Sequence, residues 1–198
     1  MTAILVNDLF HPVTRSAVCG ITADRDGAIG ARLHLLDLDN LHCGPYPSDR
    51  VAEMVRDDYR AIGFGSGDLV YTACNHRPIR KRCDEHLLSF HLAECWSPFT
   101  IRLANGPDGA DHRLIADAET FLAIDGLELR FGDVVIGSGD HIFSEIAHRF
   151  SEVGLVVHGV VSQEDTLSRE LRAEINGCLW LLPAGRCLTH IPWESTFS

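Results

Sequence analysis

The sequence predicts one α/β domain, a three-layer α/β/α sandwich whose central sheet is mostly parallel and has five or six strands. Short runs rich in leucine and β-branched residues alternate with segments of helical periodicity, which is typical of successive strand–helix–strand units. The length of 198 residues suits one well-cored domain and is too short for two large ones. The composition, 45% hydrophobic and 23% charged, is that of an ordinary globular chain.

The expected strands are short apolar runs bounded by turn residues, and the expected helices carry an apolar stripe. The clearest helix follows Ser48, a favourable N-cap, and repeats Val51, Val55 and Tyr59 on one face. The strands are expected at 33–38, 69–73, 99–103, 133–136, 155–161 and 178–182. The helices are expected at 49–62, 79–95, 110–124, 141–153 and 165–176.

The chain divides into three parts on this pattern. Residues 1–32 fit the alternation less well, and we expect an added hairpin or arm there. Residues 33–183 form the predicted domain, and residues 184–198 are expected to be a C-terminal tail.

Hydropathy and cysteine usage indicate the cellular compartment that we expect for this protein. The longest apolar runs are only a few residues, far below the roughly 18–20 that a membrane-spanning helix needs. The N-terminus lacks the basic region of a secretory signal, so we expect a cytoplasmic protein. In that compartment the seven cysteines are expected to be reduced thiols rather than a disulfide scaffold.

The formal net charge of −11 argues against a protein that coats nucleic acid without specificity, because such proteins are basic. It is compatible with a nuclease, since carboxylates around a bound divalent cation contribute negative charge. Contacts with nucleic acid would then have to be local. The candidate nucleic-acid-binding residues are Arg77, Arg80, Lys81, Arg82 and Arg113. A solvated helix start explains the RPIRKR cluster equally well.

Three aspartates are expected at the carboxyl ends of the strands, where ligands gather in open parallel sheets. Asp37 ends the first strand in LLDLDNL, and strand alternation sends Asp39 to the same face. Asp140 follows the strand DVVI in GSGDHIF, and Asp111 stands at the start of the helix after the third strand. Each alone has an ordinary explanation as a helix cap or a turn residue.

Their joint position is harder to explain without a cation. Several carboxylates in one cleft repel one another unless positive charge lies among them. Mg²⁺ and Mn²⁺ prefer such oxygen ligands and can activate a water for attack on a phosphodiester. Gly137 and Gly139 are expected to allow the tight backbone before Asp140. The sequence therefore predicts a metal-dependent acidic site.

Three motifs together resemble the NYN domain of the PIN-like nuclease superfamily. They are D-x-x-N at the end of the first strand (Asp37 and Asn40), GADHRLIAD at a helix start, and VVIGSGDHIF at a strand–turn–helix junction. The similarity covers about 33–182, in the family's order. It implies a PIN-like fold and an endoribonuclease that hydrolyses RNA, by default single-stranded, with Mg²⁺ or Mn²⁺.

The resemblance also implies roles for individual residues. Asp37, Asp111 and Asp140 would be catalytic metal ligands, with Asp117 as a further ligand. The supporting residues would be Asn40, Asp39, Ser138 and Asp108. Of these, Ser138 would contact metal-bound water or phosphate.

Two positions depart from the family pattern. Ile142 stands where many members carry a further acid. The run 105–108 replaces a Lys or Arg that often precedes the central motif, and Asp108 within it would substitute for a missing acid.

Two other functions stay open. DLDN also resembles the first motif of haloacid-dehalogenase-like phosphatases, in which Asp37 would be the nucleophile and Asp39 the acid or base. That assignment lacks the threonine usually found after the motif and leaves GADHRLIAD unexplained. The other is a catalytically inactive RNA- or protein-binding module that keeps the fold, which Ile142 and the net charge favour.

Three histidines, His42, His76 and His112, are expected to flank the cleft, where a histidine could protonate a leaving oxygen. With eleven histidines in the chain, chance proximity explains them as well. The sequence leaves open the choice of RNA or DNA, the sequence specificity, and whether an exposed apolar strand edge pairs two chains into a homodimer.

Overall fold

The computed structural model describes residues 31–44, 47–65, 67–75, 92–182 and 186–189, the last as backbone only. The predicted N-terminal arm lies almost wholly outside these described residues. So do most of the helix expected at 79–95 and the last nine residues of the expected tail.

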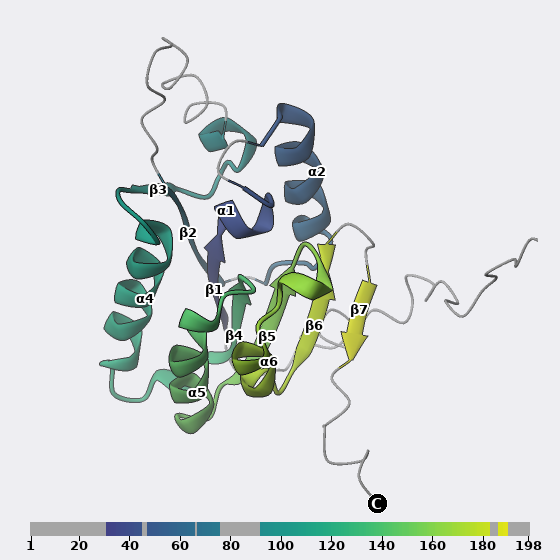
Figure 1. Ribbon diagram of the computed structural model, residues 1–198. Helices are drawn as coiled ribbons and strands as arrows, with labels where there is room; N and C mark the ends of the chain where they lie inside the picture. The colour runs from purple at the N-terminus through teal and green to yellow at the C-terminus, as the bar shows by residue number, and fades with distance from the viewer. Residues whose placement is uncertain (1–30, 45–46, 66, 76–91, 183–185, 190–198) are drawn as a thin grey trace, which may run out of the picture.

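A parallel sheet forms the centre of the described domain. Its strands are β1 (Ala31–Asp37), β2 (Leu69–Asn75), β3 (Ile101–Ala104), β4 (Phe131–Gly137), β5 (Val156–Val161), β6 (Cys178–Leu181) and β7 (Arg186–Thr189). Their order across the sheet is β3-β2-β1-β4-β5-β6-β7 (Figure 1). Strands β1 to β6 run parallel, as predicted, and β7 runs antiparallel to β6. The strand β7 lies within the stretch where the sequence predicted only a tail.

Helices cover both faces of the sheet, which confirms the predicted three-layer sandwich. They are α1 (Leu38–Leu41), α2 (Asp49–Arg60), α4 (Gly109–Leu122), α5 (Ser144–Glu152) and α6 (Arg169–Glu174), with 3₁₀ turns η2 (Leu127–Leu129), η3 (His141–Phe143) and η4 (Glu164–Thr166). Helices α4, α5 and α6 pack on one face, and α1 and α2 pack on the other (Figure 1). Among the described residues, no helix combines the length and the apolar character needed to cross a membrane.

The alternation of β1 assigns its side chains to the two faces of the sheet. Leu33 and Leu35 belong to the core beneath α4, α5 and α6, whereas Leu36 belongs to the core beneath α1 and α2. Successive strand residues point to opposite faces, so Asp37 continues the row of Leu33 and Leu35. The last residue of β1 therefore lies on the face that α4 covers.

Helix boundaries follow the capping residues more closely than the apolar stripes. Ser48 caps α2 as predicted, because its hydroxyl accepts a hydrogen bond from the backbone N–H of Val51. The helix expected at 165–176 is broken instead. Ser168 is extended, with ψ of 152°, and caps a separate α6, so that η4 and α6 are distinct elements. The helix expected at 141–153 likewise begins as the 3₁₀ turn η3 before α5.

The expectation of reduced thiols is confirmed for three cysteines and is wrong for one. Cys43, Cys74 and Cys95 are free, and the last two are buried. Cys178, at the start of β6, is disulfide-bonded. Sequence spacing shows no C-x-x-C pair, and it cannot show which distant cysteines the fold brings together.

Candidate acidic site at the carboxyl edge of the sheet

The predicted acids lie on segments that leave the sheet at one edge. Asp37 is the last residue of β1, which lies between β2 and β4, and pairs in register with Ala73 of β2. On the other side of β1, β4 ends at Gly137, three residues before Asp140. Asp111 stands in the first turn of α4. The parallel strand order thus brings together the acids that the sequence placed at strand and helix ends.

Asp37 and Asp111 are both buried, with 5% and 7% of their surface exposed. Burial, followed by the charges of Asp111 and Asp39, raises the pKa of Asp37 to about 8. Burial also raises the pKa of Asp111; a hydrogen bond with Asp37 opposes this rise, and the charges of Asp140 and Asp108 add to it. Like charge is therefore concentrated here, and these pKa shifts favour the protonated form of a carboxyl group in the cluster.

One oxygen of Asp111 has no hydrogen-bond partner among the described residues. This atom, Oδ1, is part of an ionisable carboxyl group, yet it is shielded from solvent. Buried polar atoms are nearly always hydrogen-bonded, and an exception calls for an explanation such as an absent ion or water. The charges of Asp140, Asp108 and Asp39 all act on the side chain that carries this oxygen.

Asp37 and Asn40 tie the end of β1 to neighbouring segments. The Asp37 carboxylate accepts hydrogen bonds from the backbone N–H groups of Asp39 (3.0 Å) and Asn40 (3.3 Å), so it also caps α1. The side-chain oxygen of Asn40 accepts a hydrogen bond from the backbone N–H of Gly139 at 3.0 Å. Asn40 therefore holds the loop that carries Asp140 against the end of β1.

Asp140 is the N-cap of η3. One of its oxygens accepts a hydrogen bond from the backbone N–H of Ile142 at 3.1 Å and lies 2.9 Å from Nδ1 of His141. Ser138 is fully buried, and its hydroxyl accepts a hydrogen bond from the backbone N–H of Asp140. The structure thus uses Ser138 to hold the loop instead of placing its hydroxyl at the surface. Ile142 packs against the core, which accounts for an apolar residue at that position.

Asn75 is a site residue that the sequence reasoning missed. It ends β2, its backbone N–H donates to Oδ2 of Asp39 at 2.9 Å, and its side-chain oxygen accepts a hydrogen bond from the backbone N–H of Ala110 at 3.0 Å. The one available signal was its place at the end of the run LVYTACN, beside the expected cleft. A single asparagine at a strand end is ordinary turn chemistry, so it attracted no attention.

Asp117 is paired with arginine side chains and not with the acidic cluster. Its two carboxylate oxygens accept hydrogen bonds from the guanidinium of Arg102 on β3, and Arg113 lies 3.8 Å away on the same helix. Asp108 is exposed and adopts a left-handed conformation, with φ of 52°, immediately before α4. Its charge reaches Asp111, but its side chain makes no capping hydrogen bond.

The basic residues and histidines that were expected around the cleft do not all lie there in the described part of the chain. Arg77, Arg80, Lys81, Arg82 and His76 lie outside the described residues. Arg113 and His112 are exposed on α4. His42 is buried in the core, where its Nε2 accepts a hydrogen bond from the indole N–H of Trp96 and burial lowers its pKa to about 4. It therefore has a structural place and does not border the acidic cluster as a proton donor.

The acidic cluster has donor atoms of the type that a divalent cation prefers, but in the described part of the chain they are not arranged as a complete set of ligands. The donors are hard carboxylate oxygens, which suit Mg²⁺ and Mn²⁺, and one of them is buried without a partner. Among the described residues, however, no group of three or more His, Cys, Asp or Glu side chains is arranged so that it could hold a metal ion. Metal binding here would require these side chains to be arranged differently.

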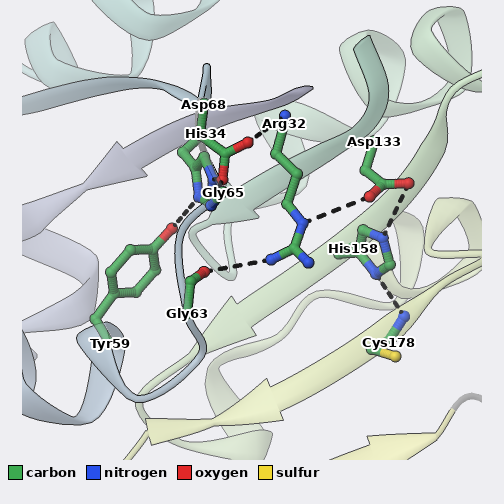
Figure 2. Close-up of polar contacts among 9 residues, drawn as sticks. All are labelled: Arg32, His34, Tyr59, Gly63, Gly65, Asp68, Asp133, His158 and Cys178. Atoms are coloured by element: carbon green, nitrogen blue, oxygen red, sulfur yellow. Dashed lines mark hydrogen bonds and ion pairs between the residues drawn. The ribbon is translucent and has the colours of Figure 1, made fainter. Parts of the chain in front are cut away.

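A second polar cluster lies near the opposite ends of the strands, on the face that α2 covers (Figure 2). Asp68 accepts hydrogen bonds from the backbone N–H groups of Arg32 (2.7 Å) and Gly65 (2.6 Å). Its Oδ2 also lies 3.4 Å from Nε2 of His34, whose Nδ1 is 2.6 Å from the hydroxyl of Tyr59. A carboxylate only accepts, so Nε2 of His34 carries the proton and the Tyr59 hydroxyl donates to Nδ1.

The same cluster continues along β1, β4 and β5. Nε of Arg32 lies 3.5 Å from Asp133, and the other oxygen of Asp133 lies 3.8 Å from Nε2 of His158 (Figure 2). The backbone N–H of Cys178 donates to Nδ1 of His158 at 2.8 Å. His34 and Arg32 are almost fully buried, so these contacts hold the sheet together and do not form an accessible site.

The fold and the acidic cluster define an α/β/α protein with a candidate ligand site at the carboxyl ends of its parallel strands. A scan against protein-family models gave no match, and neither did searches of curated proteins and of solved structures. The resemblance to NYN domains therefore rests on the three sequence motifs, and function has to be argued from the site.

Proposed function

We propose that this protein is a metal-dependent endoribonuclease that hydrolyses RNA phosphodiesters at the acidic site, with Mg²⁺ or Mn²⁺ as cofactor. The observation that carries the proposal is the buried pair of Asp37 and Asp111, in which Oδ1 of Asp111 has no partner among the described residues. A cation beside that oxygen would satisfy it and would offset the like charge of the cluster.

Asp37, Asp111 and Asp140 would hold the cation, with Asp39 close enough to add to the negative field at Asp37. When bound, a divalent cation supplies charge stabilisation at a phosphate oxygen and activation of the attacking water. Asn40 and Ser138 contribute by fixing the loop that carries Asp140. We leave Asp117 out of the ligand set, because Arg102 already binds both of its oxygens.

Substrate contact would rest on exposed groups that follow Asp111 in α4. Arg113 exposes about half of its side chain (52%) on α4, the helix that carries Asp111, and it is a candidate contact for an RNA phosphate. His112, also exposed, is the histidine next to Asp111 and the candidate donor to the leaving oxygen. A cytoplasmic location and a single-stranded RNA substrate belong to the same proposal.

A catalytically inactive binding module is the second candidate. It is favoured by Ile142, whose side chain packs into the core where many NYN domains have an acid, and by the lack of a ready-made ligand set among the described residues. This candidate predicts RNA or protein binding without cleavage.

The test is cleavage of mixed single-stranded RNA by purified protein with Mn²⁺. We expect cleavage that EDTA abolishes and that Asp140→Asn reduces at least 100-fold, while Asp165→Asn, an exposed acid on η4, leaves it unchanged. Activity that survives Asp140→Asn would mean a contaminant or another site. RNA binding without cleavage would support the inactive module. Hydrolysis of a generic phosphomonoester, with beryllium fluoride trapped on Asp37, would point to the phosphatase instead.

A further inference from the structure

We propose that Asn75 is a positioning residue that fixes the start of α4, and with it Asp111, against the end of β1. No motif singled it out, and it provides no ligand atom to the proposed cation. The part of this inference that concerns metal affinity rests on the proposed function. The part that concerns the helix start does not.

Asn75 connects three elements at the acidic edge. Its backbone N–H donates to Asp39, in α1, at 2.9 Å. Its side-chain oxygen accepts a hydrogen bond from Ala110, in the first turn of α4, at 3.0 Å. Each of these partners is close to one acid of the pair. The charge of Asp39 raises the pKa of Asp37, and Ala110 immediately precedes Asp111 in the chain. One residue of β2 therefore contacts α1, which follows Asp37, and the first turn of α4, which contains Asp111.

Helix α4 needs this contact because its own N-cap is ineffective. The first N–H groups of a helix have no partner within it and are usually satisfied by the side chain of the N-cap residue. Asp108 occupies that position, but its left-handed backbone leaves it without a capping hydrogen bond. Ala110 is almost fully buried, so water is not an alternative partner. Asn75, the last residue of β2, supplies the missing cap.

The packing around Gly109 is consistent with a fixed contact. A Cβ atom at Gly109 would lie only 2.8 Å from the side-chain oxygen of Asn75 and 3.3 Å from Ala104. The first residue of α4 therefore has to be glycine for the helix to approach Asn75 this closely. The cap and the close approach are separate observations, and both place the helix start at Asn75.

The first experiment measures amide hydrogen exchange by NMR in the protein without added metal. In Asn75→Ala we expect exchange at Ala110 to accelerate at least tenfold, while exchange at Leu114, in the middle of α4, stays within about twofold of wild type. Asn176→Ala is the matched control. Asn176 likewise accepts a hydrogen bond from a backbone N–H, that of Val157 at 2.8 Å, but it lies before β6 and outside the acidic cluster.

Asn75→Asp keeps an oxygen that can accept from Ala110, although it adds a like charge to the acidic cluster and so lowers overall stability. We expect it to restore slow exchange at Ala110, which a general loss of stability would not do. Unchanged exchange at Ala110 in Asn75→Ala, or equal acceleration there in Asn176→Ala, would overturn the positioning role. This outcome does not depend on whether the protein binds a metal.

The second experiment measures Mn²⁺ affinity by calorimetry in the same variants. We expect Asn75→Ala to bind Mn²⁺ at least fivefold more weakly than wild type, and Asn176→Ala to bind it as wild type does. If exchange changes as expected and Mn²⁺ affinity does not, the claim that Asn75 positions the ligands is overturned. If wild type binds no Mn²⁺, the proposed function fails while the exchange result still decides the capping role.

Discussion

Asp37 and Asp111 are carboxyl groups that the fold removes from water and sets beside further acids. Burial and like charge both disfavour ionisation, which is why the pKa of Asp37 rises to about 8. A site that served only to cap α1 would not need Asp111, Asp140 and Asp39 nearby. The electrostatic penalty is easier to understand if a cation completes the site.

The different surroundings of Asp111 and Asp117 give a test at single residues. Asp111 has a buried oxygen without a hydrogen-bond partner in the described part of the chain, whereas Asp117 is held by Arg102. We expect Asp111→Asn to weaken Mn²⁺ binding at least tenfold and Asp117→Asn to change it by less than about twofold, as measured by calorimetry. Equal losses in the two variants would return Asp117 to the ligand set that the sequence motif implied.

Asp68 gives a test that depends on pH. Burial would raise its pKa, but hydrogen bonds from His34 and from the backbone N–H groups of Arg32 and Gly65 outweigh burial and hold the pKa at about 2. The folded-state pKa lies below the unfolded value of 3.8, so the stabilisation is complete above about pH 4 and is lost as the pH falls toward 2.

For Asp68→Asn we therefore expect a loss of about 2 kcal/mol in the free energy of unfolding at pH 7, shrinking below pH 4. Urea unfolding of wild type and variant across that range measures it. Asp125→Asn, at an exposed position, is the control for the change of charge. If the difference in free energy of unfolding between wild type and Asp68→Asn did not change with pH, the contacts of the ionised Asp68 carboxylate would not be its cause.

At the scale of elements, the loop between β4 and η3 is fixed by close packing more than by unusual backbone angles. The sequence suggested that glycines were needed for a tight turn. In the structure, a Cβ at Gly139 would lie 2.3 Å from the carbonyl oxygen of Thr166, and the Gly139 carbonyl accepts a hydrogen bond from Ser168 at 2.8 Å. The loop that carries Asp140 is thus clamped between Asn40 and the start of α6.

Gly139→Ala is expected to lower the free energy of unfolding by about 2–3 kcal/mol, because two backbone segments would have to separate. Gly106→Ala is the comparison. That glycine has φ of +93° and open space around its Cβ position, so only backbone strain of about 1 kcal/mol applies. Chemical denaturation of both variants measures the difference. A smaller loss in Gly139→Ala than in Gly106→Ala would show that the loop moves freely.

Element types were predictable because each had a strong local signal. The cap Ser48 and the stripe through Val55 and Tyr59 identified α2, and short apolar runs identified six of the strands. The break between η4 and α6 was not predictable in this way. It depends on Ser168 adopting an extended backbone and donating to Gly139, a residue far earlier in the chain.

At the scale of the whole molecule, parallel topology explains which part of the site the sequence revealed. Asp37 and Asp140 follow adjacent strands, and parallel strands end at a common edge, so their proximity followed from the fold class. The roles of Asn75 and Arg102 did not follow. Both depend on where α4 docks across β2 and β3, which is set by packing between residues far apart in the sequence.

The polar cluster of Arg32, His34, Asp68, Asp133 and His158 was hidden for the same reason. Polar residues within strands ordinarily face water, and only the assembled sheet shows that these side chains meet under cover. This cluster at one end of the strands holds the scaffold together. The acids lie at the other end of the strands, where we propose the metal site.

The central claim is that the acidic edge binds a divalent cation, and thermal unfolding with increasing Mn²⁺ tests it most directly. A ligand that binds only the folded state raises the melting temperature, and tighter binding raises it further. We expect Mn²⁺ to raise the Tm of wild type by several degrees, EDTA to reverse the rise, and Asp37→Asn to show none. No rise in wild type, or an equal rise in Asp37→Asn, would contradict the claim.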